Sequence, residues 1–193
     1  MSGAAAFADW LSAEQYEVAL LTDLSQPLHA ADVFDAVAGL VRRGTLGQLV
    51  VYFAGHGFLR ANNEIWLLSD APGNPNEAIS LDECVELARY QSGIPNVVFI
   101  SDACRSIAES MSATRVQGSL VFPNDGPSSI SDVDLFFAAL PGMPAFETAV
   151  EESASGYEGV YTSCFLDAFR NPDGDMILTL PSGDRIVWSR IGS

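Results

Sequence analysis

The fold is decided by Leu49-Val-Val-Tyr-Phe-Ala-Gly-His56-Gly57-Phe58, an apolar run that ends abruptly in small and reactive residues. A second run repeats this pattern further along the chain, in Asn96-Val-Val-Phe-Ile-Ser-Asp102-Ala-Cys104-Arg-Ser106. Such runs are typical of buried parallel strands, which deliver side chains to the carboxyl edge of a sheet. We therefore expect two neighbouring strands whose ends bring His56 and Cys104 together.

A thiol beside an imidazole is the minimum equipment for nucleophilic acyl transfer. Taken singly, His56 could instead be a core histidine bonded to a carbonyl, and Cys104 an inert buried thiol. A zinc site is a poor alternative, because the only other histidine, His29, precedes a predicted helix and the chain has no Cys-x-x-Cys pair. The pairing of both motifs at strand ends favours a catalytic dyad.

Composition limits the class of protein. The chain has 193 residues, of which 48% are hydrophobic, so we expect one domain over residues 1–193, with a C-terminal hairpin extension over 170–193. The formal net charge of −16 would repel a nucleic-acid backbone or an anionic membrane, so neither is an expected partner.

Cysteine usage indicates the compartment. The three cysteines are an odd number in a chain too long to need disulfides, and neither a signal peptide nor an apolar run of membrane-spanning length is present. The sequence therefore predicts a reducing, cytoplasmic setting.

Periodicity predicts an alternation of strands and helices. Apolar residues at helical spacing predict helices over residues 4–15, 30–43, 81–90 and 160–170. Predicted strands cover 16–22, 49–54, 64–69, 96–103 and 135–140, and a tail hairpin pairs 176–180 with 185–188. The alternation is that of an α/β fold with a mostly parallel central sheet and right-handed crossovers.

The two motifs resemble those of the caspase and metacaspase family of cysteine peptidases. Phe-Ala-Gly-His56-Gly57 matches the family's His motif, which lies about 50 residues upstream of the Cys. Ser-Asp102-Ala-Cys104-Arg-Ser106 matches its Cys motif in the metacaspase-like form. Two later segments, 137–147 and 159–169, also resemble the family's substrate-groove segment and the helix that follows it. The resemblance implies a three-layer sandwich and an endopeptidase activity.

One departure concerns the first strand. The family fold opens with a central strand, whereas this chain begins with a helix. An empty slot would leave backbone groups unpaired at a cost of about 1–3 kcal/mol each. We expect a slot between the strands Tyr16–Thr22 and Leu49–Ala54, filled either by a segment absent from this numbering or by the tail strand at 176–180 or 185–188. A regulatory protein is a further possible partner.

The resemblance also assigns roles at the site. Cys104 is the expected nucleophile, His56 the base and then the acid, and the backbone N–H groups of Gly57 and Cys104 the donors to the oxyanion. No cofactor is expected. Some metacaspases need calcium, but the Asp125, Asp132 and Asp134 cluster reads better as a solvated loop than as a calcium site.

Substrate specificity follows from the same comparison. Animal caspases hold an aspartate with a Gln and an Arg, and the matching positions here are Asp102 and Glu147, beside Ala145 and Phe146 in the groove segment. Two carboxylates would repel an acidic side chain and attract Arg or Lys. The alternatives are that Asp102 caps a helix or pairs with Arg105, and that Glu147 is a solvated charge.

The sequence thus favours a cysteine endopeptidase that cuts polypeptides after Arg or Lys. Arg115, in a polar loop after the nucleophile, is a candidate autocleavage site, with an ordinary solvated arginine as the alternative. Two other readings stay open: a catalytically silent caspase-fold binding or scaffold module, and a relative that is active only when docked on a regulator.

Overall fold

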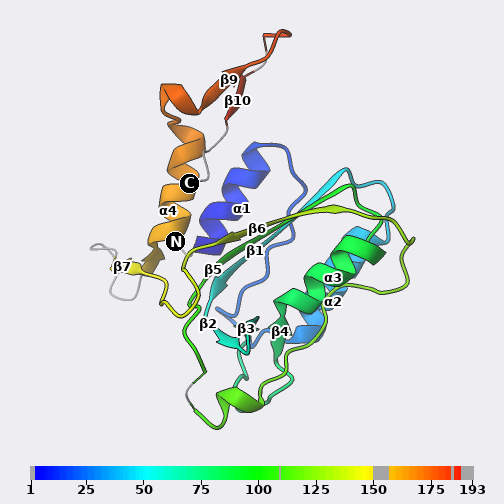
Figure 1. The fold of residues 1–193 in the computed structure, drawn as a ribbon, viewed down its shortest axis with the longest axis vertical. Helices are drawn as coiled ribbons and strands as arrows, with labels where there is room; N and C mark the ends of the chain where they lie inside the picture. Colours follow the sequence, from blue (N-terminus) through cyan, green and yellow to red (C-terminus); the bar gives the residue numbers. More distant parts are fainter. Residues whose placement is uncertain (1–2, 109, 150–156, 184, 188–193) are drawn as a thin grey trace.

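A parallel sheet forms the centre of the molecule. The structure, a computed structural model, describes residues 3–108, 110–149, 157–183 and 185–187. Three strands pair in the order β1-β5-β6, namely β1 (Gln48–Gly55), β5 (Asn96–Ala103) and β6 (Asp132–Phe137). Figure 1 shows that the two apolar runs are neighbouring parallel strands, as predicted.

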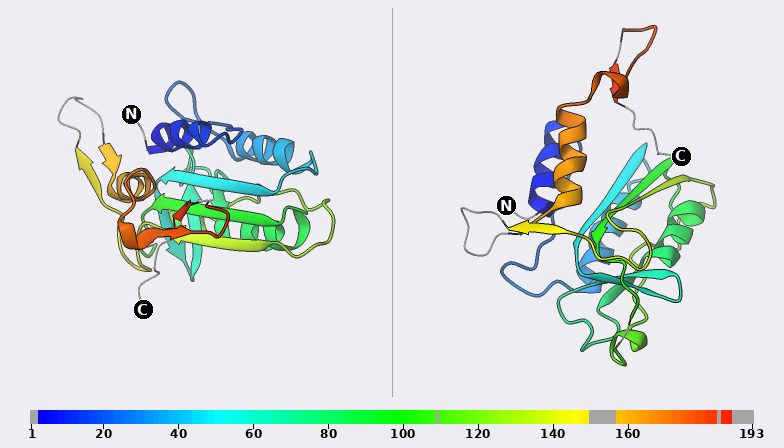
Figure 2. Two further views of the ribbon diagram at one scale, coloured as in Figure 1. Left: turned by 90° about the horizontal axis from the view of Figure 1, so that it is seen from above. Right: turned by 60° about the vertical axis from the view of Figure 1, so that its left-hand side comes forward.

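Helices cover both faces of this sheet and give the three-layer α/β architecture that was expected. Figure 2 shows α1 (Gly3–Ala13) and α4 (Val160–Arg170) together on one face, with α2 (Ala30–Val41) and α3 (Leu81–Gln91) on the other. Alternate positions of the strands serve the two cores: Val50, Tyr52, Val98 and Ile100 face α1 and α4, and Leu49, Val51, Val97 and Phe99 face α2 and α3. Burial on both faces explains why the strands read as continuous apolar runs.

A small antiparallel sheet follows His56 directly. Its strands are β2 (Gly57–Arg60), β3 (Asn63–Leu67) and β4 (Ala78–Ser80), in that order. Only the middle strand was predicted from the sequence. The ring of Trp66 on β3 stacks on Phe53 of β1 with 4.7 Å between centroids, which joins this sheet to the main core.

The remaining elements are short. Two hairpins pair β7 (Glu147–Ala149) with β8 (Tyr157–Gly159), and β9 (Ile177–Thr179) with β10 (Arg185–Val187). Two 3-10 turns are η1 (Ala113–Arg115) and η2 (Gly174–Met176). The β9–β10 hairpin lies beyond the end of α4, away from the sheet (Figure 1).

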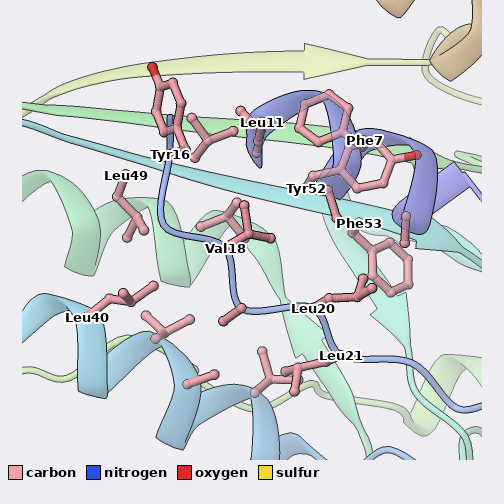
Figure 3. A pocket seen from close by; sticks show the side chains of 18 of the residues that line it. Phe7, Leu11, Tyr16, Val18, Leu20, Leu21, Leu40, Leu49, Tyr52 and Phe53 are labelled. Carbon is pink, nitrogen blue, oxygen red and sulfur yellow. The ribbon is translucent and has the colours of Figure 1, made fainter. Parts of the chain in front are cut away.

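The predicted strand Tyr16–Thr22 was wrong. This segment has no regular secondary structure and lies across a cavity of about 450 Å³ from β1 (Figure 3). Phe7, Leu11, Val18, Leu20, Leu40 and Phe53 are among the mainly apolar side chains that line the cavity. Within the described ranges, β1 pairs with β5 on one side and with no strand on the other, so it is an edge strand. A strand is stabilised by its partner, and here the partner position beside residues 16–22 is a cavity.

The two tail strands do not fill this cavity. β9 and β10 pair with each other, and the part of the tail that the structure describes makes no ladder with β1. The slot that was expected beside Leu49–Ala54 is therefore present as an apolar cavity, and the expectation that a tail strand might occupy it was wrong for the described residues.

Candidate active site

The register of the main sheet brings the two motifs together. Gly55 and Ala103 are partners at the ends of β1 and β5, so His56 and Cys104 are the next residues on adjacent parallel strands. His56 is exposed and Cys104 is partly exposed, as groups that meet a substrate must be. The backbone positions of His56 and Cys104 are thus adjacent at a solvent-facing strand edge, and an imidazole close to a thiol is an arrangement that can perform acyl transfer.

Gly57 lies against the nucleophile turn. A Cβ built on Gly57 would lie 3.0 Å from the carbonyl oxygen of Cys104 and 3.0 Å from the Cβ of Ala103. The backbone of β2 therefore approaches this turn so closely that a side chain at position 57 would require its neighbours to move by a few tenths of an ångström. This placement is compatible with the predicted role of Gly57 as an oxyanion donor, which stays a prediction.

Asp102 is a buried carboxylate on β5. The hydroxyl of Thr162 on α4 donates to its Oδ2 over 2.5 Å, and the hydroxyl of Tyr52 lies 2.5 Å from the same Thr162 oxygen. Thr162 has one proton and gives it to the carboxylate, so Tyr52 is the donor to Thr162. Asp102 lies within a strand, so the alternative that it caps a helix does not apply.

Burial changes the titration of the two tyrosines near this carboxylate. It raises the pKa of Tyr52 well above the ordinary value of a phenol, and the charge of Asp102 adds to the shift. It also raises the pKa of Tyr161 to about 12, with the same carboxylate as the second cause. Both phenols therefore remain neutral over the physiological pH range.

The predicted groove segment reaches the same place. The N–H of Ala145 donates to Sγ of Cys104 over 3.4 Å. The carbonyl of Phe146 accepts from Val160 at the start of α4, while its side chain is 69% exposed. The backbone of Glu147 pairs with Gly159 between β7 and β8.

Gly159 links the two predicted specificity residues. A Cβ at this position would lie 2.2 Å from Oδ2 of Asp102, so only glycine lets β8 pass over the carboxylate. Because Gly159 also pairs with Glu147, the structure gathers Asp102 and the Glu147 backbone around one glycine. Gly159 and Thr162 lie in the segment 159–169, and no role was predicted for either residue.

Arg115 lies apart from these residues. It is the exposed last residue of η1, and the next residue, Val116, is fully buried. The carbonyl of Val116 accepts a hydrogen bond from Arg60 over 2.7 Å. The bond after Arg115 is therefore held in folded structure.

Glu64 was missed as a site residue. It is a buried carboxylate on β3, and its Oε2 lies 2.7 Å from Nε of Arg105, the residue after the nucleophile. The alternative partner suggested for Asp102 was Arg105, whereas the ion pair of Arg105 is with Glu64. One glutamate within an apolar strand gives no sequence signal that would distinguish it from a solvent-facing residue.

The described residues contain neither a metal-binding group of side chains nor a helix that could span a membrane. No group of three or more His, Cys, Asp or Glu side chains in residues 3–108, 110–149, 157–183 and 185–187 could hold a metal ion. Asp125, of the acidic cluster considered for calcium, lies 3.6 Å from Arg42. Among these residues, no helix has the length and apolar character that crossing a membrane requires.

Comparison with known proteins identifies the family. A family model for the caspase domain matches residues 3–181, which is most of the chain. A comparison with curated proteins gives no match. The matched range contains both strand-end motifs, α4 and the groove segment. The chain therefore belongs to the caspase domain family of cysteine peptidases.

Proposed function

We propose that the protein is an endopeptidase in which Cys104 is the nucleophile and His56 the acid and base. The observation that carries this proposal is the register of β1 and β5, which makes the two residues neighbours at one sheet edge. The Cys104 thiol gives its proton to His56 and attacks the peptide carbonyl, and His56 then returns the proton to the leaving amine. Water attacks the acyl-enzyme with His56 again as base, and the acid product leaves.

The remaining chemistry needs no cofactor. The negative oxygen of the tetrahedral intermediate would be held by the backbone N–H groups of Gly57 and Cys104, which cost no reorganisation at the moment of reaction. The thiol and the imidazole supply the nucleophile and all proton transfers. The substrate is a polypeptide.

We propose that the residue before the scissile bond is Arg or Lys, bound by Asp102. This proposal is supported by the burial of the carboxylate and by its bond with Thr162, which leaves a fixed negative charge beneath Gly159. A charge of this kind in a partly desolvated place favours a cationic side chain and disfavours an acidic one. Glu147, whose backbone pairs with Gly159, is the proposed second carboxylate.

One experiment tests both parts. Fluorogenic peptides with Arg, Lys or Asp before the reporter group are incubated with the parent protein and with Cys104→Ala. Cys164→Ala is the matched control, because Cys164 is an exposed free cysteine on α4. We expect cleavage of the basic peptides by the parent and by Cys164→Ala only. Cleavage by Cys104→Ala would refute the nucleophile, and a preference for Asp would refute the pocket. His56→Ala should be as inactive as Cys104→Ala.

The open edge of β1 supports a second proposal, that the active form contains one more polypeptide strand. The cavity is lined by apolar side chains, and one side of β1 also offers backbone N–H and C=O groups to it. A polypeptide strand would fill the apolar space and form hydrogen bonds with these backbone groups, whereas a lipid chain would only fill the space. Gly3 packs near Tyr52 and Ala54, toward the carboxyl end of β1. A strand that leads into α1 from the slot would therefore run parallel to β1.

Hydrogen exchange tests this proposal without an activity assay. An eight-residue apolar strand fused ahead of residue 1 should slow exchange of the β1 amides and raise the melting temperature, and the same peptide added separately is the comparison. If the β1 amides of the parent already exchange as slowly as those of β5, the edge is not open. If only the separate peptide protects them, a separate regulatory protein is favoured over a joined segment.

We also propose a cytoplasmic location. Cys84, Cys104 and Cys164 are free in the structure, and a thiol nucleophile needs a reducing compartment to remain reduced.

A further inference from the structure

The buried carboxylate of Glu64 is the centre of a polar network beneath the nucleophile turn. It is 1% exposed. Its Oε1 accepts from Nε1 of Trp66 over 3.1 Å and from the hydroxyl of Ser101 over 2.5 Å, while Oε2 faces Nε of Arg105 at 2.7 Å. A buried ion pair is costly to desolvate, and apolar replacements are often as stable. Stability is therefore a weak explanation for the Glu64–Arg105 ion pair. The other contacts of Arg105 indicate a second role for the pair.

Arg105 also contacts the end of β6 and the chain that follows it. Its guanidinium lies 3.9 Å from the ring centroid of Phe137 and donates to the carbonyl of Ala139 over 3.3 Å. Its backbone N–H donates to the carbonyl of Met143 over 3.0 Å, and its own carbonyl accepts from Gly142 over 2.9 Å. One residue thus joins the buried network of β3 and β5 to the turn in the first half of the groove segment 137–147.

This turn leads directly to the nucleophile. Two residues after Met143, the N–H of Ala145 donates to Sγ of Cys104. Arg105 is bonded covalently to Cys104 and through hydrogen bonds to the turn that carries Ala145. Arg105 therefore ties the nucleophile to the groove segment, and the charge of Glu64 holds the Arg105 guanidinium through the ion pair.

We propose that Glu64 and Arg105 are positioning residues, which hold the groove segment 137–147 against the nucleophile so that an extended peptide can bind. This inference rests on the proposed peptidase function. Neither residue is assigned a proton transfer. Their loss should impair reactions that use the groove and spare reactions that use only the thiol.

Two alkylating agents separate these cases. Iodoacetamide needs only the thiol, whereas an acyloxymethyl ketone on an arginyl peptide needs the groove as well. The variants are Arg105→Lys, which keeps the charge, and Glu64→Gln with Arg105→Gln, which leaves no unpaired charge in the interior. The matched control is the exposed pair Glu17 and Arg43, changed to Gln at both positions. Each protein also carries Cys164→Ala, and intact mass reports labelling of Cys104.

We expect both site variants to react with the peptide reagent at least tenfold more slowly than the parent, while their iodoacetamide rates stay within threefold. Hydrogen exchange over residues 138–147 should become faster in the site variants alone, and this readout does not depend on activity. A parallel loss with both reagents would indicate general damage and overturn the proposal, as would unchanged rates with both. The parent could fail to cleave any peptide while hydrogen exchange over residues 138–147 is still faster in the site variants. That result would count against the peptidase function and not against the positioning role.

Discussion

Replacement of Thr162 by Val tests the hydrogen-bonded network around Asp102. Thr162 is fully buried, and the change keeps its branched shape while it removes the hydroxyl that joins Asp102 to Tyr52. A hydrogen bond to a charged group contributes about 1.5–3 kcal/mol and a neutral one about 0.5–1.5 kcal/mol. We expect the free energy of unfolding to fall by about 2–4 kcal/mol. For a domain of this size, each kcal/mol lowers the melting temperature by about 2–4 °C.

The measurement is thermal and urea unfolding at pH 7, with Thr162→Ser as the control. Serine keeps the hydroxyl and loses one methyl group, which costs about 1 kcal/mol. Tyr52→Phe removes the other end of the network, and its effect should be less than additive with Thr162→Val because the two changes share one bond. If the Val variant unfolds at the same urea concentration as the parent, the hydroxyl contributes nothing and the argument for a positioned Asp102 loses its support.

Three further predictions concern substrate charge, self-cleavage and alkaline stability. Asp102→Asn should lower kcat/KM for arginyl peptides by about ten- to a thousandfold relative to a neutral peptide, measured with matched fluorogenic substrates. The bond after Arg115 leads into buried Val116, so self-cleavage there requires local opening of the fold. Mass spectrometry should therefore detect a slow break after Arg115 in the parent protein and no such break in Cys104→Ala. If no Cys104-dependent break is found, activation comes from a partner. Burial raises the pKa of the Cys84 thiol to about 11, so the unfolded state loses this proton first. Stability should therefore fall between about pH 9 and 11 by up to about 1.4 kcal/mol per pH unit, and urea unfolding of Cys84→Ala should lack this part of the fall.

The adjacency of His56 and Cys104 at one sheet edge could be predicted from the sequence because it depends on two strands alone. Burial of β1 and β5 on both faces produces uninterrupted apolar runs, and residues that end such runs share one edge of a parallel sheet. The amphipathic helices were predictable for a similar reason, since each buries one face.

Other features depend on contacts that no local pattern encodes. Residues 16–22 have the composition of a strand, but a strand also needs a neighbour, and a cavity lies in its place. The strands β2 and β4 have four and three residues, too few to show a period. Thr162 meets Asp102 only because α4 packs on the sheet, and Glu64 meets Arg105 only because β3 folds beneath the nucleophile turn.

The open edge of β1 has a consequence for the behaviour of the protein in solution. Natural edge strands usually carry a charge, a proline or a bulge that prevents pairing between copies, whereas Gln48–Gly55 contains neither a charged residue nor a proline. Protection against aggregation would then come from the net charge of −16, which acts at long range and is screened by salt. The screening length falls from about 8 Å at physiological ionic strength to about 3 Å at 1 M. Concentrated salt should therefore weaken the protection of the uncharged β1 edge against pairing between copies.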